Sequence, residues 1–318
     1  MIRFLINRIL FGILVMFIVS VVVFLIFFAG GDPAPRFCGK VCTPSQLAVV
    51  KKRLYLDHSL FDQYLHYMNN VLHGNLGESF ANQQTVNSII KSGLPATASL
   101  AIGAAIVWLL IGIPIGITAA TRPRSIRDRL ATVFALTGLS LPTFVAGLLL
   151  LEVAFYQLTV HGLHWFPAAG YVSLTDDPAQ WFVHLVLPWL TLAFVTAATY
   201  SRLTRASLLD VLGEDYIRTA RAKGLSERRV IYKHGLRSAL TPIVTLLGID
   251  IGTLLGGTIV TEQLFGLHGI GQSALQAQER GDLPVVLGTV LVAAFFIVVA
   301  NIIVDILYAV LDSRVRLS

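Results

Sequence analysis

Long uninterrupted apolar runs are the feature of this sequence that most restricts how the chain can fold. A bilayer core about 30 Å thick requires about 20 apolar residues in a helix, because each residue adds about 1.5 Å. The six segments that meet this requirement are Ile9–Ala29, Ala96–Ala120, Leu130–Leu158, Phe182–Tyr200, Leu240–Thr261 and Pro284–Leu311. The chain is 55% hydrophobic and only 13% charged, whereas soluble domains carry about 25% charged residues. The sequence therefore predicts an all-α membrane protein with six transmembrane helices.

The apolar runs also divide the chain. The first run is longer than the core of a secretory signal, which spans roughly 7–15 residues, and no convincing cleavage site follows it. We expect residues 1–29 to remain as an N-terminal transmembrane helix. Residues 30–95 are predicted to form an extracytoplasmic loop with short helices. Residues 96–318 then form a five-helix core that includes a long cytoplasmic connection at about 205–238.

The basic residues predict the orientation. Arginines precede the first predicted helix, follow the second and crowd the connection between the fourth and fifth. The connection between the third and fourth helices has no lysine or arginine, only Asp176 and Asp177. Because basic loops stay in the cytoplasm, both termini are predicted to lie there. The net charge of +6 therefore largely reflects the basic residues of the cytoplasmic loops. The sequence has no basic patch interleaved with aromatic residues, so nucleic-acid binding is not indicated.

The long cytoplasmic connection has the pattern of two short helices and a sharp corner. Glu214 and Asp215 begin the first helix, where the helix dipole favours negative charge. Glu214 and Arg218 stand four residues apart in the favourable order. Gly224 suits the left-handed position that ends a helix, and Ser226 can cap the next one. A stiff helical corner is expected.

Tyr216, Ala220 and Gly224 fall on one face of that first helix. Small side chains let another backbone approach closely, which favours docking into a groove on a soluble partner. The alternative is a basic loop that stays solvated near anionic lipid headgroups. Spacing alone leaves both interpretations open.

The stretch Glu214–Ser226, which reads EDYIRTARAKGLS, resembles the EAA loop of ABC importer permeases in its dipeptide/oligopeptide (DppB/OppB-like) version. It lacks the literal Glu-Ala-Ala opening, but Ala220 and Gly224 are in place. The likeness extends over nearly the whole chain. It includes the segments Gly74–Ser79, Ser140–Phe144, Gly256–Glu262 and Asp305–Tyr308.

This resemblance implies a type I ABC importer permease fold in a bacterial plasma membrane, with the extracytoplasmic helical insertion between the first two helices. It implies that the loop forms the coupling helix that sits in a cleft of the ATPase. The residues that this role would involve are Glu214, Asp215, Tyr216, Arg218, Ala220, Ala222, Lys223 and Gly224. The implied partners are a second homologous permease, two ATP-binding cassette subunits, an extracytoplasmic substrate-binding lipoprotein and the lipid bilayer. ATP and Mg would bind the ATPases, so the chain itself is expected to be non-enzymatic and to hold no cofactor.

The resemblance also bears on cargo and mechanism. It implies alternating access, with di- or oligopeptides as cargo, although relatives that carry nickel or glycosides leave those cargos open. An ion-coupled secondary transporter is the competing hypothesis. It would use intramembrane acidic residues but would leave the coupling loop without a purpose. Pairing of the permease as a homodimer or a heterodimer is also open.

Four acidic residues lie within or near the ends of the predicted spans, where charge is costly. Asp250 lies near the middle of the fifth span and Glu152 in the third, and either could line the pathway and meet a terminal ammonium group. The alternative for Asp250 is a buried hydrogen bond to a neighbouring helix or to the partner permease. For Glu262 and Asp305, which lie nearer the span edges, we favour such hydrogen bonds.

The outer segment carries an apolar stripe of Phe61, Tyr64, Leu65, Met68 and Leu72 at helical spacing. We favour packing of this stripe on the outer surface of the bundle. Contact with a delivered substrate or a binding protein is the alternative.

Cys38 and Cys42 lie in the same outer segment and form either a short-loop disulfide or two free thiols. No histidine cluster stands near them at the spacing of a zinc site, so no metal site is expected.

Gly266–Ser273 matches the spacing of a phosphate-binding P-loop, but Gln272 stands where the lysine is required. The segment also follows a membrane helix on the outer side. Nucleotide binding is therefore not expected there.

Overall fold

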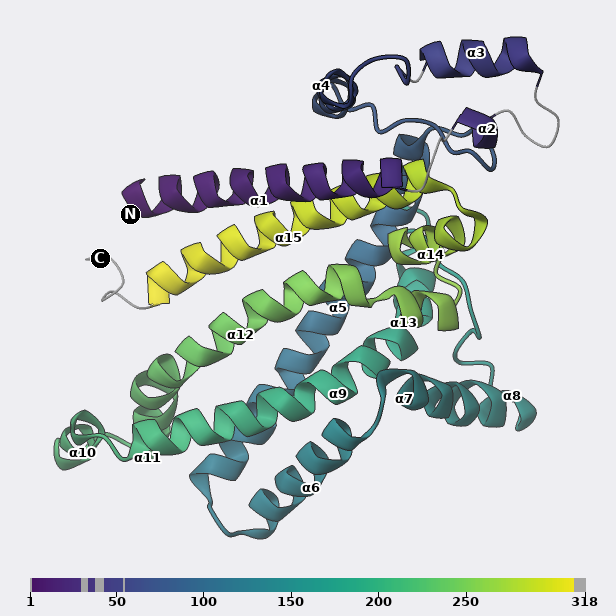
Figure 1. Cartoon of the computed structure of the whole chain (residues 1–318). Coiled ribbons are helices and arrows are strands. Elements are labelled where there is room, and N and C mark those ends of the chain that lie inside the picture. Colours follow the sequence, from purple (N-terminus) through teal and green to yellow (C-terminus); the bar gives the residue numbers. More distant parts are fainter. Residues whose placement is uncertain (1, 30–33, 38–42, 54, 312–318) are drawn as a thin grey trace.

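The computed structural model describes residues 2–29, 34–37, 43–53 and 55–311 (Figure 1). These residues form helices joined by connections, and the strand-like pairing among them is one isolated bridge between Glu78 and Thr85. The disulfide considered for Cys38 and Cys42 lies outside the described residues.

Six helical segments in the described part of the chain are long and apolar enough to cross a membrane. They are Ile6–Ile26, Val86–Thr121, Thr143–Val160, Pro178–Leu212, Glu227–Gly252 and Leu283–Ile306. Each overlaps one of the predicted spans, so the prediction of an all-α protein with six membrane helices is confirmed.

The longest helices begin at local start signals. The Thr85 side chain accepts a hydrogen bond from the backbone N–H of Ser88, so α5 (Val86–Thr121) begins at Val86 and not at the predicted Ala96. Asp177 accepts bonds from the N–H groups of the second and third residues of α9 (Pro178–Leu212), and Pro178 occupies its first position. The other long helices are α1 (Ile2–Ala29), α12 (Leu236–Gly257) and α15 (Leu283–Leu311).

The third predicted span, Leu130–Leu158, is wrong as one continuous helix. Leu141 is extended, with φ −93° and ψ 122°, because a residue before proline is driven away from the helical region. The segment therefore divides at Leu141 and Pro142. The parts are α6 (Ile126–Ser140), α7 (Thr143–Leu150), a π-helical stretch at Leu151–Gln157 and α8 (Leu158–Val160).

The core lies where α5 packs against α9 and α12. Trp108 of α5 and Tyr200 of α9 are fully buried there, with ring centroids 5.8 Å apart. A Cβ at Gly112 would lie 2.8 Å from the Ala197 carbonyl oxygen, and one at Gly116 would lie 2.6 Å from that of Ser201. These two glycines therefore allow α5 to approach the α9 backbone closely.

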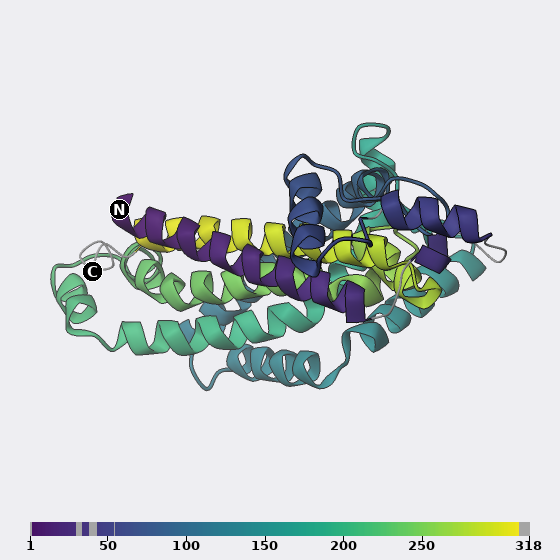
Figure 2. The ribbon, with the colours of Figure 1, turned by 45° about the horizontal axis from the view of Figure 1, so that its top comes forward.

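The short helices gather at the two ends of the bundle, and α1 lies beside α15 (Figures 1 and 2). The first turn of α1, the last turn of α15 and α10 (Asp215–Ala222) share one end, called here the α10 end. The opposite end, called the α14 end, carries several other short helices. These are α2 (Ala34–Phe37), α3 (Pro44–Arg53), α13 (Ile259–Leu264) and α14 (Ile270–Arg280), and α4 (Leu60–Leu72) crosses α1 nearby.

Candidate functional site

The predicted helical corner is present at the α10 end. α10 follows α9 after Gly213 and Glu214, and Glu214 takes the extended conformation of a helix-capping residue. Gly224 has φ +76°, which confirms the predicted left-handed end. The chain then forms α11 (Glu227–Arg229) and a π-helical stretch, Val230–Gly235, that leads into α12. Residues 213–235 are called here the α10 corner.

The prediction that Ala220 belongs to an exposed docking face is wrong. Ala220 is 8% exposed and packs with Ile217 and Val230 inside this chain, so its small size allows α10 to approach its own subunit. Tyr216 is partly exposed and donates a hydrogen bond to Ser238 Oγ over 3.1 Å. The predicted coupling residues that are exposed are Glu214, Asp215, Tyr216, Arg218, Ala222, Lys223 and Gly224.

Two ion pairs hold the α10 corner. Arg218 pairs with Asp215 at 3.3 Å and not with Glu214, the partner that spacing predicted. Arg221 makes two bonds to Glu227, from Nη2 to Oε1 at 2.8 Å and from Nε to Oε2 at 3.1 Å. This two-point contact joins α10 to α11 across Gly224, so it fixes the angle of the corner.

A third pair lies where α6 meets α9. Arg205 Nε and Nη2 contact the two carboxylate oxygens of Asp128 at 2.6 and 3.0 Å. The backbone N–H of Arg124 adds a bond of 2.9 Å to the same carboxylate. The hydrogen bond from Arg205, and then that from Arg124, hold the pKa of Asp128 below its ordinary value. Sequence analysis did not identify this pair, because its members are 77 residues apart.

The two predicted pathway residues lie in different surroundings. Asp250 is half-buried in α12, and its carboxyl lies close enough to the buried Tyr200 hydroxyl for an electrostatic interaction. Glu152 is exposed on the π-helical stretch after α7, where the Gln157 amide donates a 2.8 Å hydrogen bond to it. Asp250 therefore faces the helix bundle, whereas Glu152 faces away from the chain.

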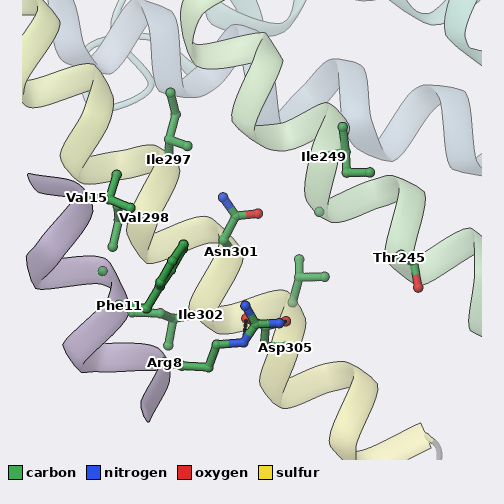
Figure 3. Close-up of a pocket in the computed structure, with 13 residues that line it drawn as sticks. Arg8, Phe11, Val15, Thr245, Ile249, Ile297, Val298, Asn301, Ile302 and Asp305 are labelled. Atoms are coloured by element: carbon green, nitrogen blue, oxygen red, sulfur yellow. Dashed lines mark hydrogen bonds and ion pairs between the residues drawn. The ribbon is translucent and has the colours of Figure 1, made fainter. Parts of the chain in front are cut away.

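Asp305 meets Arg8 of α1, as Figure 3 shows. Arg8 Nε lies 2.8 Å from Oδ2 and Nη2 lies 2.9 Å from Oδ1. The pair lines one part of a cavity of about 480 Å³ between α1, α12 and α15. Thus the predicted bond from Asp305 to a neighbouring helix is present, but it is not buried as predicted, since the Arg8 and Asp305 side chains are 45% and 22% exposed.

Glu262 of α13 is fully buried, and hydroxyl and backbone groups satisfy its carboxylate. Thr97 and Thr258 donate to Oε1 over 2.7 and 3.1 Å, and the backbone N–H of Gln272 donates to Oε2 over 2.8 Å. Thr97 in turn accepts a bond from the N–H of Ile270. The predicted hydrogen bonding of Glu262 is therefore confirmed, and it joins α5, α13 and α14.

The same contacts explain the segment that resembles a P-loop. The N–H of Gln272 is directed at the Glu262 carboxylate, and the Gln272 side chain accepts a 2.7 Å bond from the N–H of His268. The Gln272 N–H thus already binds an anion that belongs to the protein, and the N–H groups of His268 and Ile270 donate to neutral side-chain oxygens.

A second buried carboxylate, Asp282, holds the outer loop before α5. Its Oδ1 accepts a bond of 2.9 Å from the N–H of Phe80, and its Oδ2 accepts bonds from the Ser79 hydroxyl and from the N–H of Ala81. The prediction from sequence singled out Gly74–Ser79 but did not identify this partner.

The chain matches known transport proteins over its whole length. A family model described as "Binding-protein-dependent transport system inner membrane component" matches residues 112–317, and a model for the N-terminal part of such components matches residues 1–101. The glutathione transport system permease protein GsiC of Escherichia coli strain K12 is 38% identical over 317 residues, which is 99% of each chain. GsiC of Salmonella typhimurium strain LT2 has the same identity and coverage.

The fold has solved counterparts. Two crystal forms of the inward-facing MetNI methionine ABC transporter align with 70% of this chain and 96% of theirs. Their TM-scores are 0.52 and 0.54, at 20% identity, and they establish the type I importer permease fold alone. Because the family model spans most of the chain and the relatives match end to end, the chain belongs to the inner membrane components of binding-protein-dependent transport systems, the permease subunits of ABC importers.

Proposed function

We propose that this permease carries di- and oligopeptides. The cargo in the relatives' names supports this class, since glutathione is itself a short peptide. Nickel ions and glycosides are the competing cargos. A second permease subunit completes the pathway and ATPase subunits drive it, as expected of an ABC importer permease.

The α10 corner is the proposed contact with the ATPase subunits, which would bind ATP and Mg and hydrolyse the ATP. The observation that carries this proposal is the division of α10 into two faces. Ile217 and Ala220 are buried, whereas Asp215, Arg218 and Ala222 are exposed on the opposite side at helical spacing. A groove of the ATPase would therefore receive the face around Ala222, while the buried face passes the displacement to α9 and α12.

The α10 end would lie in the cytoplasm with both chain termini, and the α14 end would receive the substrate-binding lipoprotein. Half-buried Asp250 would line this subunit's half of the pathway and meet the ammonium group of a peptide. Glu152, being exposed, would face the second permease or the pathway.

The test uses the complete transporter in vesicles, with ATPase activity and uptake measured together. Ala222→Trp should prevent docking while α10 keeps its buried face, and Gly224→Pro should distort the corner because proline cannot adopt a positive φ. We expect loss of uptake in both variants with normal membrane insertion. Arg127→Gln is the control, since Arg127 lies outside the α10 corner, is exposed and has no ion pair among the described residues.

Normal uptake in both α10 variants would exclude the proposed coupling role. Uptake is compared for glutathione, dipeptides, nickel and a glycoside. Transport of nickel or the glycoside without the peptides would exclude the proposed cargo but not the coupling role.

A further inference from the structure

Helix α4 uses only part of its apolar surface to pack on the bundle. Tyr64 bonds to Ser20 of α1 at 2.9 Å, and its ring contacts Phe17 and Phe24 with centroids 6.4 and 5.3 Å away. Tyr67 and Val71 pack against a cluster formed by Val23 of α1 with Leu287 and Leu291 of α15. These three α4 residues, Tyr64, Tyr67 and Val71, are the packed flank.

Beside the packed flank lies an apolar strip that contacts little of this chain. Phe61, Leu65 and Leu72 are 68%, 50% and 79% exposed. They stand four and seven residues apart, so they project from one side of the helix. Asp62 and Asn69 lie roughly 60–80° around the helix from the middle of this strip, where the side with exposed polar groups begins. Helix α4 is therefore amphipathic even after it has packed, with Phe61, Leu65 and Leu72 as its free flank.

The position of α4 indicates what surrounds this free flank. Its packed flank contacts residues inside two apolar spans, Ile6–Ile26 and Leu283–Ile306. From Phe17 to Ile26 the helix rises about 13 Å, which lies within the roughly 15 Å of one leaflet of the hydrocarbon core. Helix α4 also crosses α1 instead of running along it (Figures 1 and 2). It thus lies across the bundle at the depth of a leaflet.

Helix α4 is also fixed in rotation. Ser59 accepts a bond from the N–H of Asp62 at its start. The Gln63 amide donates to the carbonyl of His58 over 2.7 Å, and the Tyr55 ring stacks on His58 and His66 with centroids 4.2 Å away. The free flank therefore cannot turn inward without breaking these contacts.

We propose that α4 is an interfacial helix whose free flank inserts into the lipid leaflet at the α14 end. Helix α1, which α4 crosses, presents further exposed apolar side chains, including Ile18, Val22 and Leu25. An amphipathic helix at this depth buries its apolar side among acyl chains and keeps its polar side in water. Helix α4 would thereby anchor the outer segment, whatever cargo the transporter carries.

The test places a nitroxide spin label on the complete transporter in vesicles. Cys38→Ser and Cys42→Ser provide the background, and single cysteines replace Phe61, Leu65 or Leu72, with Asp62→Cys and Asn69→Cys as matched controls on the same helix. These side chains are exposed, so the substitutions leave the core intact. Collision rates with oxygen, which concentrates in lipid, and with a water-soluble nickel chelate are then measured.

We expect the ratio of oxygen to chelate collisions to be severalfold higher at the free flank than at Asp62 and Asn69. Equal access of the chelate to both sides would overturn the proposal in favour of a water-facing loop. Protection of the free flank from both reagents would overturn it in favour of a covering protein. Each result is independent of uptake, so it also separates this inference from the proposed function.

Discussion

The two ends of the bundle use charge in opposite ways. At the α10 end, carboxylates pair with arginines, as in Arg221–Glu227, Arg205–Asp128 and Arg8–Asp305. At the α14 end, buried Glu262 and Asp282 accept hydrogen bonds from hydroxyl and backbone N–H groups, and neither has an ion pair in the described structure. These two buried carboxylates therefore depend on neutral donors, unlike the arginine-paired carboxylates at the α10 end.

This difference indicates which contacts are easier to open. The Arg221–Glu227 pair is partly exposed, so water can replace its partners when the pair opens. Opening the Glu262 contacts would leave buried donors and a carboxylate unsatisfied, which costs much more. We infer that the contacts at the α14 end are costlier to open than the ion pairs at the α10 end, and four substitutions test this inference.

Glu262→Ala should have the largest effect. It removes the acceptor of Thr97, Thr258 and the Gln272 N–H, which should lower the free energy of unfolding by about 3 kcal/mol or more. Thermal unfolding in detergent measures the loss. Glu262→Gln, which retains one acceptor oxygen, should lose less. Equal loss in the two variants would show that the hydrogen bonds do not hold this corner.

Asp282→Ala should come next, at about 2–3 kcal/mol. It leaves the Ser79 hydroxyl and the N–H groups of Phe80 and Ala81 without their acceptor. Hydrogen exchange of residues 79–82 should accelerate while exchange in α9 stays unchanged. Unaltered exchange in the loop would contradict the assignment of Asp282 as its anchor.

Asp128→Asn tests the partly buried pair at the α10 end and should cost about 1–2 kcal/mol near neutral pH. Because the folded state lowers the pKa of Asp128, its contribution is present above the ordinary aspartate pKa of about 3.9. It disappears as the pH falls through the lowered folded value. Unfolding midpoints of the wild type and the variant should therefore converge in acid. A constant difference at all pH values would contradict this.

Arg221→Gln should have the smallest effect on stability, below about 1 kcal/mol, because its pair is exposed. The informative measurement is peptide uptake per ATP hydrolysed, which should fall as the corner loses its fixed angle. The double variant Arg221→Glu with Glu227→Arg should recover much of this ratio at low salt and less at high salt. No change in the ratio would mean that this pair does not stiffen the corner.

Local patterns predicted local structure well. The left-handed conformation of Gly224, the membrane helices and the hydrogen bonding of Glu262 were all predicted. Each prediction used only the residues of one continuous segment. The burial of Ala220 was not predicted because spacing identifies a helix face but not the neighbour that this face meets. The break at Leu141 and Pro142 was missed because an apolar run can cross a bend without any change in composition.

The contacts between distant segments could not be predicted. Ser79 and Asp282 lie 203 residues apart, and no pattern within either segment identifies the other. Tyr200, close to Asp250, was likewise indistinguishable from other aromatic residues of a membrane helix. The pathway role of Asp250 and Glu152 is still a prediction.

The length and packing of helix α9 determine how a movement of α10 is transmitted through the subunit. It is 35 residues long, about 52 Å, and joins α10 directly after Gly213 and Glu214. Gly112 and Gly116 set it against α5, and Gly138 of α6 lies against its Ala198 on another side. Because α9 is one helix over this length and is packed on two sides, a displacement of α10 at one end can be carried along it toward the other end of the subunit.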